Sequence, residues 1–194
     1  MRIEINEISE EEYELYSQIP IKFEVRSKYR LENIDQVLGG IKFFEEKVDH
    51  PYIKDYDSIS DYSIERWGKE FDISSWGIFI AELDGIPVGG VGIAYDTEGV
   101  NMLDGRDDIS VIWDIRIHPE HRGEGIGSKL FDHAVEWSIE RDCKYLKVET
   151  QNINVPACKF YVSKGCELGY IDKYAYYEEG LEDEVKLVWF RELK

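Results

Sequence analysis

Apolar and polar residues alternate in several short segments of this chain, and this period of two is typical of β-strands. The first such segment is Arg2 to Ile8, where Ile3 and Ile5 share one face. The other segments that we expect to be strands are Trp76–Leu83, Ile86–Tyr95, Ile109–Ile117, Tyr145–Thr150, 167–177 and 184–192. Asp84-Gly85 separates the first two of these and is typical of a tight hairpin, so those two strands are predicted to pair.

Apolar residues spaced three and four positions apart predict helices elsewhere. This spacing is clearest in Gly125–Arg141, and Val155–Lys164 is a shorter helical segment. Ser9 and Glu12 have the spacing of a capping box, which marks the first turn of a helix. We therefore expect another helix to begin at Ser9.

The segment between residues 31 and 62 carries weaker signals. We expect a helix over roughly Leu31–Val48, although Gly39-Gly40 weakens its middle because glycine is a poor helix former. Asp49–Tyr62 is polar, aromatic and rich in turn residues, and it lacks the Gly, Ser and Pro monotony of a linker, so we expect a loop. With 194 residues, the chain is predicted to form one mixed α/β domain over residues 1–194.

Composition narrows the classes of partner. The chain carries 23 Lys and Arg against 41 Asp and Glu, and this net charge of −18 disfavours nucleic acids and anionic membranes but favours cations. It has no apolar run of about 18 residues, and its N-terminal residues are acidic where a signal peptide is basic and apolar, so we expect a cytoplasmic protein. Cys143, Cys158 and Cys166 form no Cys-x-x-Cys pair and are expected to be reduced. His118 and His121 have no further ligand nearby, so no metal site is predicted.

The segment from His121 to Leu130, HRGEGIGSKL, contains three glycines at alternate positions. Its spacing is not that of the Walker loop, because Lys129 follows Ser128 rather than preceding it, and it is not the dinucleotide fingerprint G-x-G-x-x-G. The loop nevertheless follows a strand, a proline-containing turn and an arginine, and it precedes a helix. This order places free backbone amides at a helix N-terminus, which attracts anions. A tight connector between strand and helix is the alternative explanation of the same glycines.

Arg122-x-x-Gly125-x-Gly127 matches R/Q-x-x-G-x-G/A, the segment that wraps the pyrophosphate of acetyl-CoA in GCN5-related N-acetyltransferases, and the chain resembles that family. A second match is Asn154-x-x-Ala157-x-x-Phe160-Tyr161, followed by Gly165. The resemblance extends from about residue 76 to the C-terminus. It implies a mixed α/β fold with a mostly antiparallel, twisted sheet of about seven strands and about four flanking helices. In that fold the fourth and fifth strands are parallel and splay around acetyl-CoA.

Within this family the chain is similar to the streptothricin acetyltransferases. The similar segments are His50–Asp57, Glu149–Gly169, Tyr174–Glu178 and Glu184–Phe190. Those enzymes acetylate an amino group of the antibiotic's β-lysine part, and related enzymes acetylate other small amines or protein N-termini. The region before His50 departs from them.

The resemblance also implies which residues hold acetyl-CoA as a co-substrate. Arg122 and the backbone amides of the glycine loop would bind the pyrophosphate; the loop residues are Gly123, Glu124, Gly125, Ile126, Gly127 and Ser128. The backbone of Ile115, Arg116 and Ile117 would pair with the pantetheine arm as another strand would, and the Arg116 side chain could instead make a surface ion pair. Asn154 would bind the same arm or cap the short helix.

Acetyl transfer from a thioester to an amine needs a neutral amine, a donor for the oxyanion and an acid for the departing thiolate. By resemblance Tyr161 is the acid, and the alternative is a tyrosine of the core. Asp114 and Glu149 are the two candidate bases; each could instead be a carboxylate satisfied by hydrogen bonds, and many family members use water. Cys158 is expected to pack rather than to carry the acetyl group, so direct attack in a ternary complex is predicted.

The sequence therefore predicts an acetyl-CoA-dependent N-acetyltransferase for a primary amine of a cationic small molecule, with a streptothricin-type antibiotic as the first candidate and resistance as the role. Acidic and aromatic residues in Asp49–Tyr62 and Tyr170–Glu179 are expected to line the acceptor cleft, unless they form only a solvated rim. Two other functions stay open, namely acetylation of a protein or peptide amine and acyl-CoA sensing without catalysis. A homodimer also stays open.

Overall fold

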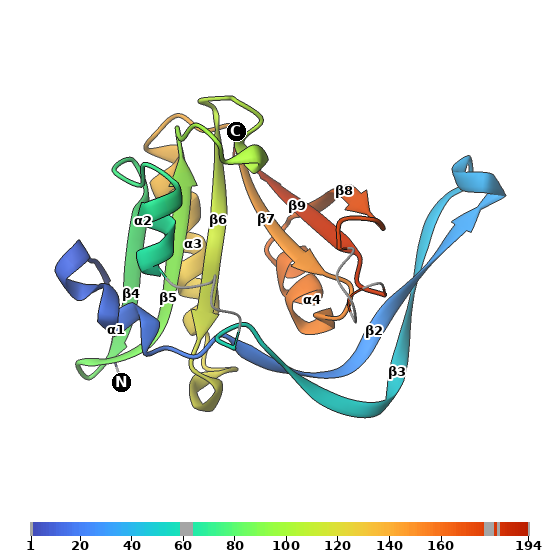
Figure 1. Cartoon of the computed structure of the whole chain (residues 1–194), viewed down its shortest axis with the longest axis horizontal. Coiled ribbons are helices and arrows are strands. Elements are labelled where there is room, and N and C mark those ends of the chain that lie inside the picture. Colours follow the sequence, from blue (N-terminus) through green and yellow to red (C-terminus); the bar gives the residue numbers. More distant parts are fainter. Residues whose placement is uncertain (1, 59–63, 177–180, 182, 194) are drawn as a thin grey trace. The chain divides into compact units, whose positions relative to one another are not determined.

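Strands and helices are interleaved along the chain in the computed structural model, which describes residues 2–58, 64–176, 181 and 183–193 (Figure 1). The strands are β1 (Ile3–Glu7), β2 (Lys22–Ile34), β3 (Gly40–Asp55), β4 (Gly77–Leu83), β5 (Ile86–Tyr95), β6 (Ile109–Ile117), β7 (Tyr145–Gln151), β8 (Glu167–Asp172) and β9 (Lys186–Glu192). The α-helices are α1 (Tyr13–Ser17), α2 (Ile64–Glu70), α3 (Ile126–Ile139) and α4 (Val155–Ser163). The chain divides into two compact units: unit 1 is Met1–Lys22, Asp55–Val148 and Phe190–Lys194, and unit 2 is Phe23–Lys54 and Glu149–Trp189.

Among the described residues, seven strands form one sheet in the hydrogen-bonded order β1-β4-β5-β6-β7-β9-β8, and β2 pairs with β3. The pairs β1–β4, β4–β5 and β5–β6 are antiparallel, whereas β6 and β7 are parallel. The predicted mixed α/β fold is thus confirmed. The parallel pair is β6–β7 rather than the fourth and fifth strands, because β2 and β3 add two strands before it.

The two edges of β6 differ in unit 1. β5 pairs with β6 as far as Ile117. β7 pairs with β6 only as far as Ile112, which lies opposite Val148. Within the described residues of unit 1, the second half of the strand, Asp114–Ile117, therefore has a strand partner on one edge only, and Trp113 before it lies at a bulge without a register partner in β5.

Glycines in β5 let helices of unit 1 approach both faces of its strands. A Cβ on Gly90 would lie 2.5 Å from the Tyr16 ring of α1, and one on Gly92 would lie 2.9 Å from the Trp67 ring of α2. On the other face, a Cβ on Gly89 would lie 2.9 Å from Ile126 of α3. Figure 1 shows α2 and α3 on opposite faces of these strands. The absence of side chains at these glycines therefore makes room for the helices that cover the sheet.

The helix predicted over Leu31–Val48 is wrong, because this region belongs to β2, a turn and β3. Phe23, Val25 and Leu31 are separated by even numbers of residues, and each is less exposed than its neighbours. This period of two is the strand signal for β2. Gly40 has a φ of +95°, which glycine adopts readily, and it begins β3 after the turn. The paired glycines therefore mark a turn between strands, not a weakness in a helix.

The remaining differences concern the ends of elements. The loop predicted over Asp49–Tyr62 is wrong in its first part, because β3 continues to Asp55, and residues 59–62 lie outside the described residues. β8 ends at Asp172 and β9 begins at Lys186, so both are shorter than predicted, and residues 177–180 and 182 of the segment between them are outside the described residues. α2 was not predicted. The other predicted elements agree to within two residues at each end.

The N-terminal capping box is confirmed. Ser9 precedes a 3-10 turn, Glu10–Glu12, that leads into α1, and the Glu12 carboxylate accepts a hydrogen bond from the Ser9 amide at 3.0 Å. The three predicted free cysteines are free and buried. No described helix combines the length and the apolar character that crossing a membrane requires.

Candidate active site

The glycine loop follows β6 directly in unit 1. A 3-10 turn, Pro119–His121, succeeds the strand, and α3 begins at Ile126 with Gly125 as its N-cap. Gly123 and Gly125 have φ values of +83° and +84°, and a Cβ on either would meet no atom within 4 Å. The loop therefore needs glycine for its backbone conformation, and the space beside its backbone is open.

The first turn of α3 presents backbone amides to that space. The bond that closes the first turn runs from the Lys129 amide to the Gly125 carbonyl at 3.1 Å. The amides of Ile126, Gly127 and Ser128 precede it and have no acceptor within the helix. Together with the helix dipole, these N–H groups favour an anion, in a chain whose net charge is −18.

Arg122, at the start of the loop, is anchored by two backbone carbonyls of unit 1. Its Nε donates to the Ile117 oxygen at 3.3 Å, and its Nη2 donates to the Lys22 oxygen. A guanidinium has five N–H donors, so further donors remain for an anion. Burial lowers the pKa of Arg122 from its ordinary value, although the side chain stays charged at neutral pH.

Asp114 and Arg116 form a buried ion pair on one face of β6. Arg116 Nε donates to Asp114 Oδ1 at 2.9 Å, and Nη2 donates to Oδ2 at 2.7 Å. The two side chains are only 4% and 3% exposed, so the surface ion pair considered for Arg116 is wrong: the pair is buried. Although burial opposes the charge of Arg116, the neighbouring Asp114 holds the pKa of the guanidinium above its ordinary value.

Tyr16 of α1 completes this network. Its hydroxyl donates to Asp114 Oδ1 at 2.7 Å, and its ring lies 4.9 Å from the guanidinium carbon of Arg116. Burial, and then the charge of Asp114, raise the pKa of Tyr16 well above its ordinary value. Sequence reasoning missed Tyr16, because no local pattern connects it with a residue 98 positions away. Asp114 therefore accepts three hydrogen bonds, one from Tyr16 and two from Arg116.

Glu149, the other candidate base, lies in unit 2 and is more accessible, with 27% of its side chain exposed. Tyr176 donates its hydroxyl to Glu149 Oε1 at 2.8 Å, and Lys186 Nζ lies 2.5 Å from Oε2. Gln151 Nε2 donates to the Tyr176 hydroxyl at 2.9 Å. Glu149 is thus a carboxylate that already binds an ammonium group.

The second predicted motif forms α4 of unit 2. Asn154 is the N-cap of this helix, and its Oδ1 accepts a hydrogen bond from the Ala157 amide at 3.2 Å, as one of its two predicted roles requires. Tyr161 is buried, and its ring centre lies 5.5 Å from Phe160 and 6.5 Å from Trp189. Cys158 is buried on the same helix, and burial raises the pKa of its thiol to about 12.

Asn152 is a buried polar residue of unit 2 that sequence reasoning missed. Its Nδ2 donates to the carbonyls of Tyr29 and Asp183 at 3.0 and 3.3 Å, and its Oδ1 accepts from the Val185 amide at 2.8 Å. It therefore joins β2 to the segment that precedes β9. Its position two residues before Asn154 carried no signal, since these partners come from distant parts of the chain.

The predicted site residues thus divide between the two units. Unit 1 brings together the backbone of Ile115, Arg116 and Ile117 with Arg122 and the glycine loop. Unit 2 holds Glu149, Asn154 and Tyr161. Of the segments expected to line the acceptor cleft, residues 59–62 and 177–179 lie outside the described residues.

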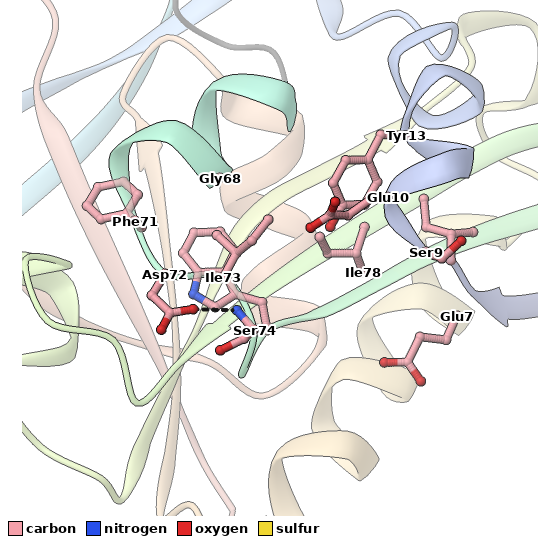
Figure 2. A pocket seen from close by; sticks show the side chains of 12 residues that line it. Glu7, Ser9, Glu10, Tyr13, Gly68, Phe71, Asp72, Ile73, Ser74 and Ile78 are labelled. Carbon is pink, nitrogen blue, oxygen red and sulfur yellow. Dashed lines mark hydrogen bonds between the residues drawn. The ribbon is translucent and has the colours of Figure 1, made fainter.

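Unit 1 also has a cavity of about 450 Å³, and none of these residues is among its lining residues, whose side chains are drawn in Figure 2. Tyr13, Phe71 and Trp76 give it aromatic walls, and Glu10 and Asp72 are among its acidic residues. It lies where β4 begins, whereas the glycine loop follows the end of β6 at the other end of the paired strands, since β4, β5 and β6 are successively antiparallel. The predicted donor-binding residues are therefore remote from this cavity along the sheet.

Comparison with known proteins shows which family combines such a strand, glycine loop and helix. The chain belongs to the acetyltransferase (GNAT) family, whose model matches residues 41–166. The matched region includes the glycine loop and the Asn154–Tyr161 motif. The predicted family is thus confirmed.

Two relatives are streptothricin acetyltransferases. Streptothricin acetyltransferase A of Bacillus subtilis (strain 168) is 28% identical over 154 residues, which are 78% of this chain and 80% of the relative. Streptothricin acetyltransferase of Escherichia coli is 30% identical over 144 residues, 72% of this chain and 70% of the relative. A proposed streptothricin acetyltransferase of Bacillus anthracis strain Ames, solved with acetyl coenzyme A, has a TM-score of 0.74 and 26% identity over 100% of this chain and 99% of its own.

Proposed function

We propose that this acetyltransferase transfers the acetyl group of acetyl-CoA to a primary amine of a cationic small molecule, by direct attack within a ternary complex. One observation carries the proposal most strongly. The half-paired segment Asp114–Ile117 is followed, after one 3-10 turn, by a glycine loop with open space and free amides beside it. An unpaired strand edge and an anion site in succession suit a donor that has an amide-containing arm and a pyrophosphate.

The residues of unit 1 fit such a donor. Arg122 and the backbone amides from Gly123 to Ser128 would hold the pyrophosphate, and the positive φ values at Gly123 and Gly125 keep the backbone approachable. The backbone of Ile115, Arg116 and Ile117 would pair with the pantetheine amides. In unit 2, Asn154 caps α4 through its Oδ1 only, so its side-chain N–H groups would be available to the pantetheine arm. When bound, acetyl-CoA supplies the activated thioester.

Glu149 is the base that we propose, in preference to Asp114. Asp114 is buried, and both of its oxygens already accept hydrogen bonds from Tyr16 and Arg116, so little of it is accessible to an incoming amine. Glu149 is partly exposed, and its contact with Lys186 shows that it accommodates an ammonium group. Removal of a proton from the incoming ammonium, directly or through water, makes the amine nucleophilic, because a lysine-like amine has a pKa of about 10.4.

Tyr161 is the proposed acid for the leaving thiolate. Its place on α4, beside Phe160 and Trp189, keeps the ring fixed. A cysteine relay is disfavoured, because the buried Cys158 thiol has a pKa of about 12 and almost no thiolate at neutral pH. Direct attack by the amine on the thioester is therefore the simpler route.

A streptothricin-type antibiotic is the first acceptor to test, and resistance would be the corresponding role. Support comes from the two relatives with that activity in their names and from the net charge of −18, which favours a cationic substrate. A protein or peptide amine is the second candidate acceptor. A sensor without catalysis is disfavoured, because the chain keeps the whole glycine loop, Asn154 and Tyr161.

The test incubates the purified chain and acetyl-CoA with streptothricin, with small polyamines and with a peptide panel. Release of free coenzyme thiol and a product heavier by one acetyl group are followed for each amine. We expect thiol release with streptothricin and none with peptides. Thiol release only with peptides would mean that the acceptor is a peptide or protein amine rather than streptothricin. Binding of acetyl-CoA without thiol release in the presence of any amine would favour an acyl-CoA sensor without catalysis.

A further inference from the structure

The second half of β6 must hold its backbone in place although it has a strand partner on one edge only in unit 1. An edge that pairs with a donor molecule needs its N–H and C=O groups fixed to within about 0.5 Å of the productive geometry. β5 pairs with one edge of this half, Asp114–Ile117, through Gly92 to Gly89. The opposite edge has no such support within the described residues of unit 1. Some other element has to restrain it.

We propose that Arg116 positions the backbone of this edge and that Asp114 and Tyr16 hold the Arg116 side chain in place. This inference rests on the proposed function, because it concerns the strand that would bind the pantetheine arm. Side chains two residues apart on a strand lie on the same face. The two-pronged hydrogen bond from Arg116 to Asp114, at 2.9 and 2.7 Å, therefore spans Ile115 and fixes the pleat around its peptide groups.

The same guanidinium ties this segment to the chain that passes beside it. Arg116 Nη1 donates to the Ile19 carbonyl at 3.1 Å and lies 3.8 Å from Asp57 Oδ1. The other oxygen of Asp57 accepts a hydrogen bond from the Ile21 amide at 2.9 Å. Arg116 thus connects β6 with two further segments of unit 1, after α1 and after β3.

Arg122 reaches the same passing segment from the glycine loop. It donates to the Lys22 carbonyl and also to the Ile117 carbonyl at the end of β6. The backbone of one short stretch, Ile19–Lys22, therefore accepts a hydrogen bond from Arg116 of the half-paired strand and another from Arg122 of the proposed pyrophosphate loop. The proposed pantetheine edge and pyrophosphate loop share one anchor.

Stability alone does not explain a buried ion pair here. Removing two charges from water costs free energy that their attraction only partly recovers, and apolar residues often serve a core as well. The fold nevertheless makes room for the pair. The residues opposite Asp114 and Arg116 in β5 are Gly92 and Gly90, which admit the rings of Trp67 and Tyr16. Such an arrangement fits a restraint on geometry.

The test compares Asp114→Asn, Arg116→Lys and Tyr16→Phe with the control Asp104→Asn. Asp104 also pairs with a buried cation, Lys147, but lies outside the strand edge and the loop. We expect the first three variants to weaken acetyl-CoA affinity, measured by calorimetry, by about tenfold or more for Asp114→Asn and Arg116→Lys. A tenfold change corresponds to about 1.4 kcal/mol. Asp104→Asn should leave this affinity within about twofold.

The pH profile separates positioning from base catalysis. With the amine that the wild-type chain acetylates, Asp114→Asn should lower kcat yet keep the acidic limb of kcat/KM, whereas Glu149→Gln should remove that limb. Loss of the limb in Asp114→Asn would overturn the proposal and make Asp114 the base. Unchanged acetyl-CoA affinity in both Asp114→Asn and Arg116→Lys would overturn it as well.

A third readout does not depend on turnover. Amide hydrogen exchange at Ile115–Ile117 should be faster in Tyr16→Phe, which removes one hydroxyl and keeps the ring, than in the wild type or Asp104→Asn. Equal exchange would contradict the proposal even if Asp114→Asn failed to fold. If the wild-type chain bound no acetyl-CoA, the proposed function would fail, and this exchange measurement would still decide whether the network holds the strand.

Discussion

The hydroxyl of Tyr16 donates a hydrogen bond to Asp114 Oδ1 at 2.7 Å, which joins α1 to a strand 98 residues later. Both side chains are buried, and Arg116 donates one hydrogen bond to each oxygen of the Asp114 carboxylate. This contact makes Asp114 part of a closed network with Tyr16 and Arg116.

Tyr16→Phe should change how stability depends on pH. Burial and the Asp114 charge raise the pKa of Tyr16, so the folded chain keeps the phenol proton at a pH where the unfolded chain has lost it. The stabilisation is complete below the unfolded pKa of about 10 and declines as pH rises above it, by up to about 1.4 kcal/mol per pH unit. Urea unfolding between about pH 8 and 11.5 should therefore show a shallower decline for Tyr16→Phe than for the wild type.

Tyr174→Phe is the control, since that side chain is 88% exposed. Its decline should match the wild type. The same decline in all three proteins would mean that Tyr16 does not titrate differently in the folded state.

Tyr161→Phe should lower turnover much more than donor binding. The change removes the hydroxyl and keeps the ring that packs near Phe160 and Trp189. Loss of a general acid costs about 10²-fold or more in rate. We expect kcat for thiol release to fall by that amount, while the acetyl-CoA dissociation constant stays within about threefold. Equal activity would remove Tyr161 from the mechanism.

Gly125→Ala should weaken acetyl-CoA binding, and Gly85→Ala should not. The two glycines have φ of +84° and +81°, and a Cβ on either meets no atom within 4 Å. Both substitutions therefore carry the same conformational cost, about 1–2 kcal/mol, measured as lost unfolding free energy. Only Gly125 lies where we propose that a pyrophosphate approaches the backbone, so calorimetry should show about tenfold weaker binding for Gly125→Ala alone. Equal acetyl-CoA affinities of the two variants would mean that the glycine loop does not bind the donor.

Cys158→Ala should retain acetyl transfer. Burial raises the pKa of this thiol to about 12, so about one molecule in 10⁴ carries a thiolate at pH 8. We expect native protein to react slowly with a thiol reagent, and intact mass after mixing with acetyl-CoA alone to show no acetylated enzyme. A transient mass increase that Cys158→Ala abolishes would instead establish a covalent intermediate.

The strand, loop and helix around the donor residues could be predicted from the sequence because their signals are local. Ile109–Ile117 and Ile126–Ile139 have clear apolar patterns, and Gly123 and Gly125 occupy positive-φ positions that other residues adopt at a cost. Each of these preferences acts over a few residues. The family motif consists of the same local features, so it too was visible in the chain.

The Leu31–Val48 region shows where local signals fail. Residues such as Leu31, Glu32 and Gln36 are acceptable in a helix, but the segment pairs across Gly39-Gly40 as β2 and β3. A strand is stabilised by its partner and by what covers it, so its propensity depends on context more than that of a helix. The turn chemistry of the two glycines was the better guide.

By itself, the sequence determined the local structure of the proposed donor site, because a glycine at positive φ, a helix N-terminus and a strand ending are properties of a few consecutive residues. Only the tertiary structure decided which partners the two candidate carboxylates have. Asp114 accepts hydrogen bonds from Tyr16, 98 residues away, and from Arg116, whereas Glu149 contacts Tyr176 and Lys186. Contacts between residues far apart in the chain form only when the fold brings them together, so no local pattern records them.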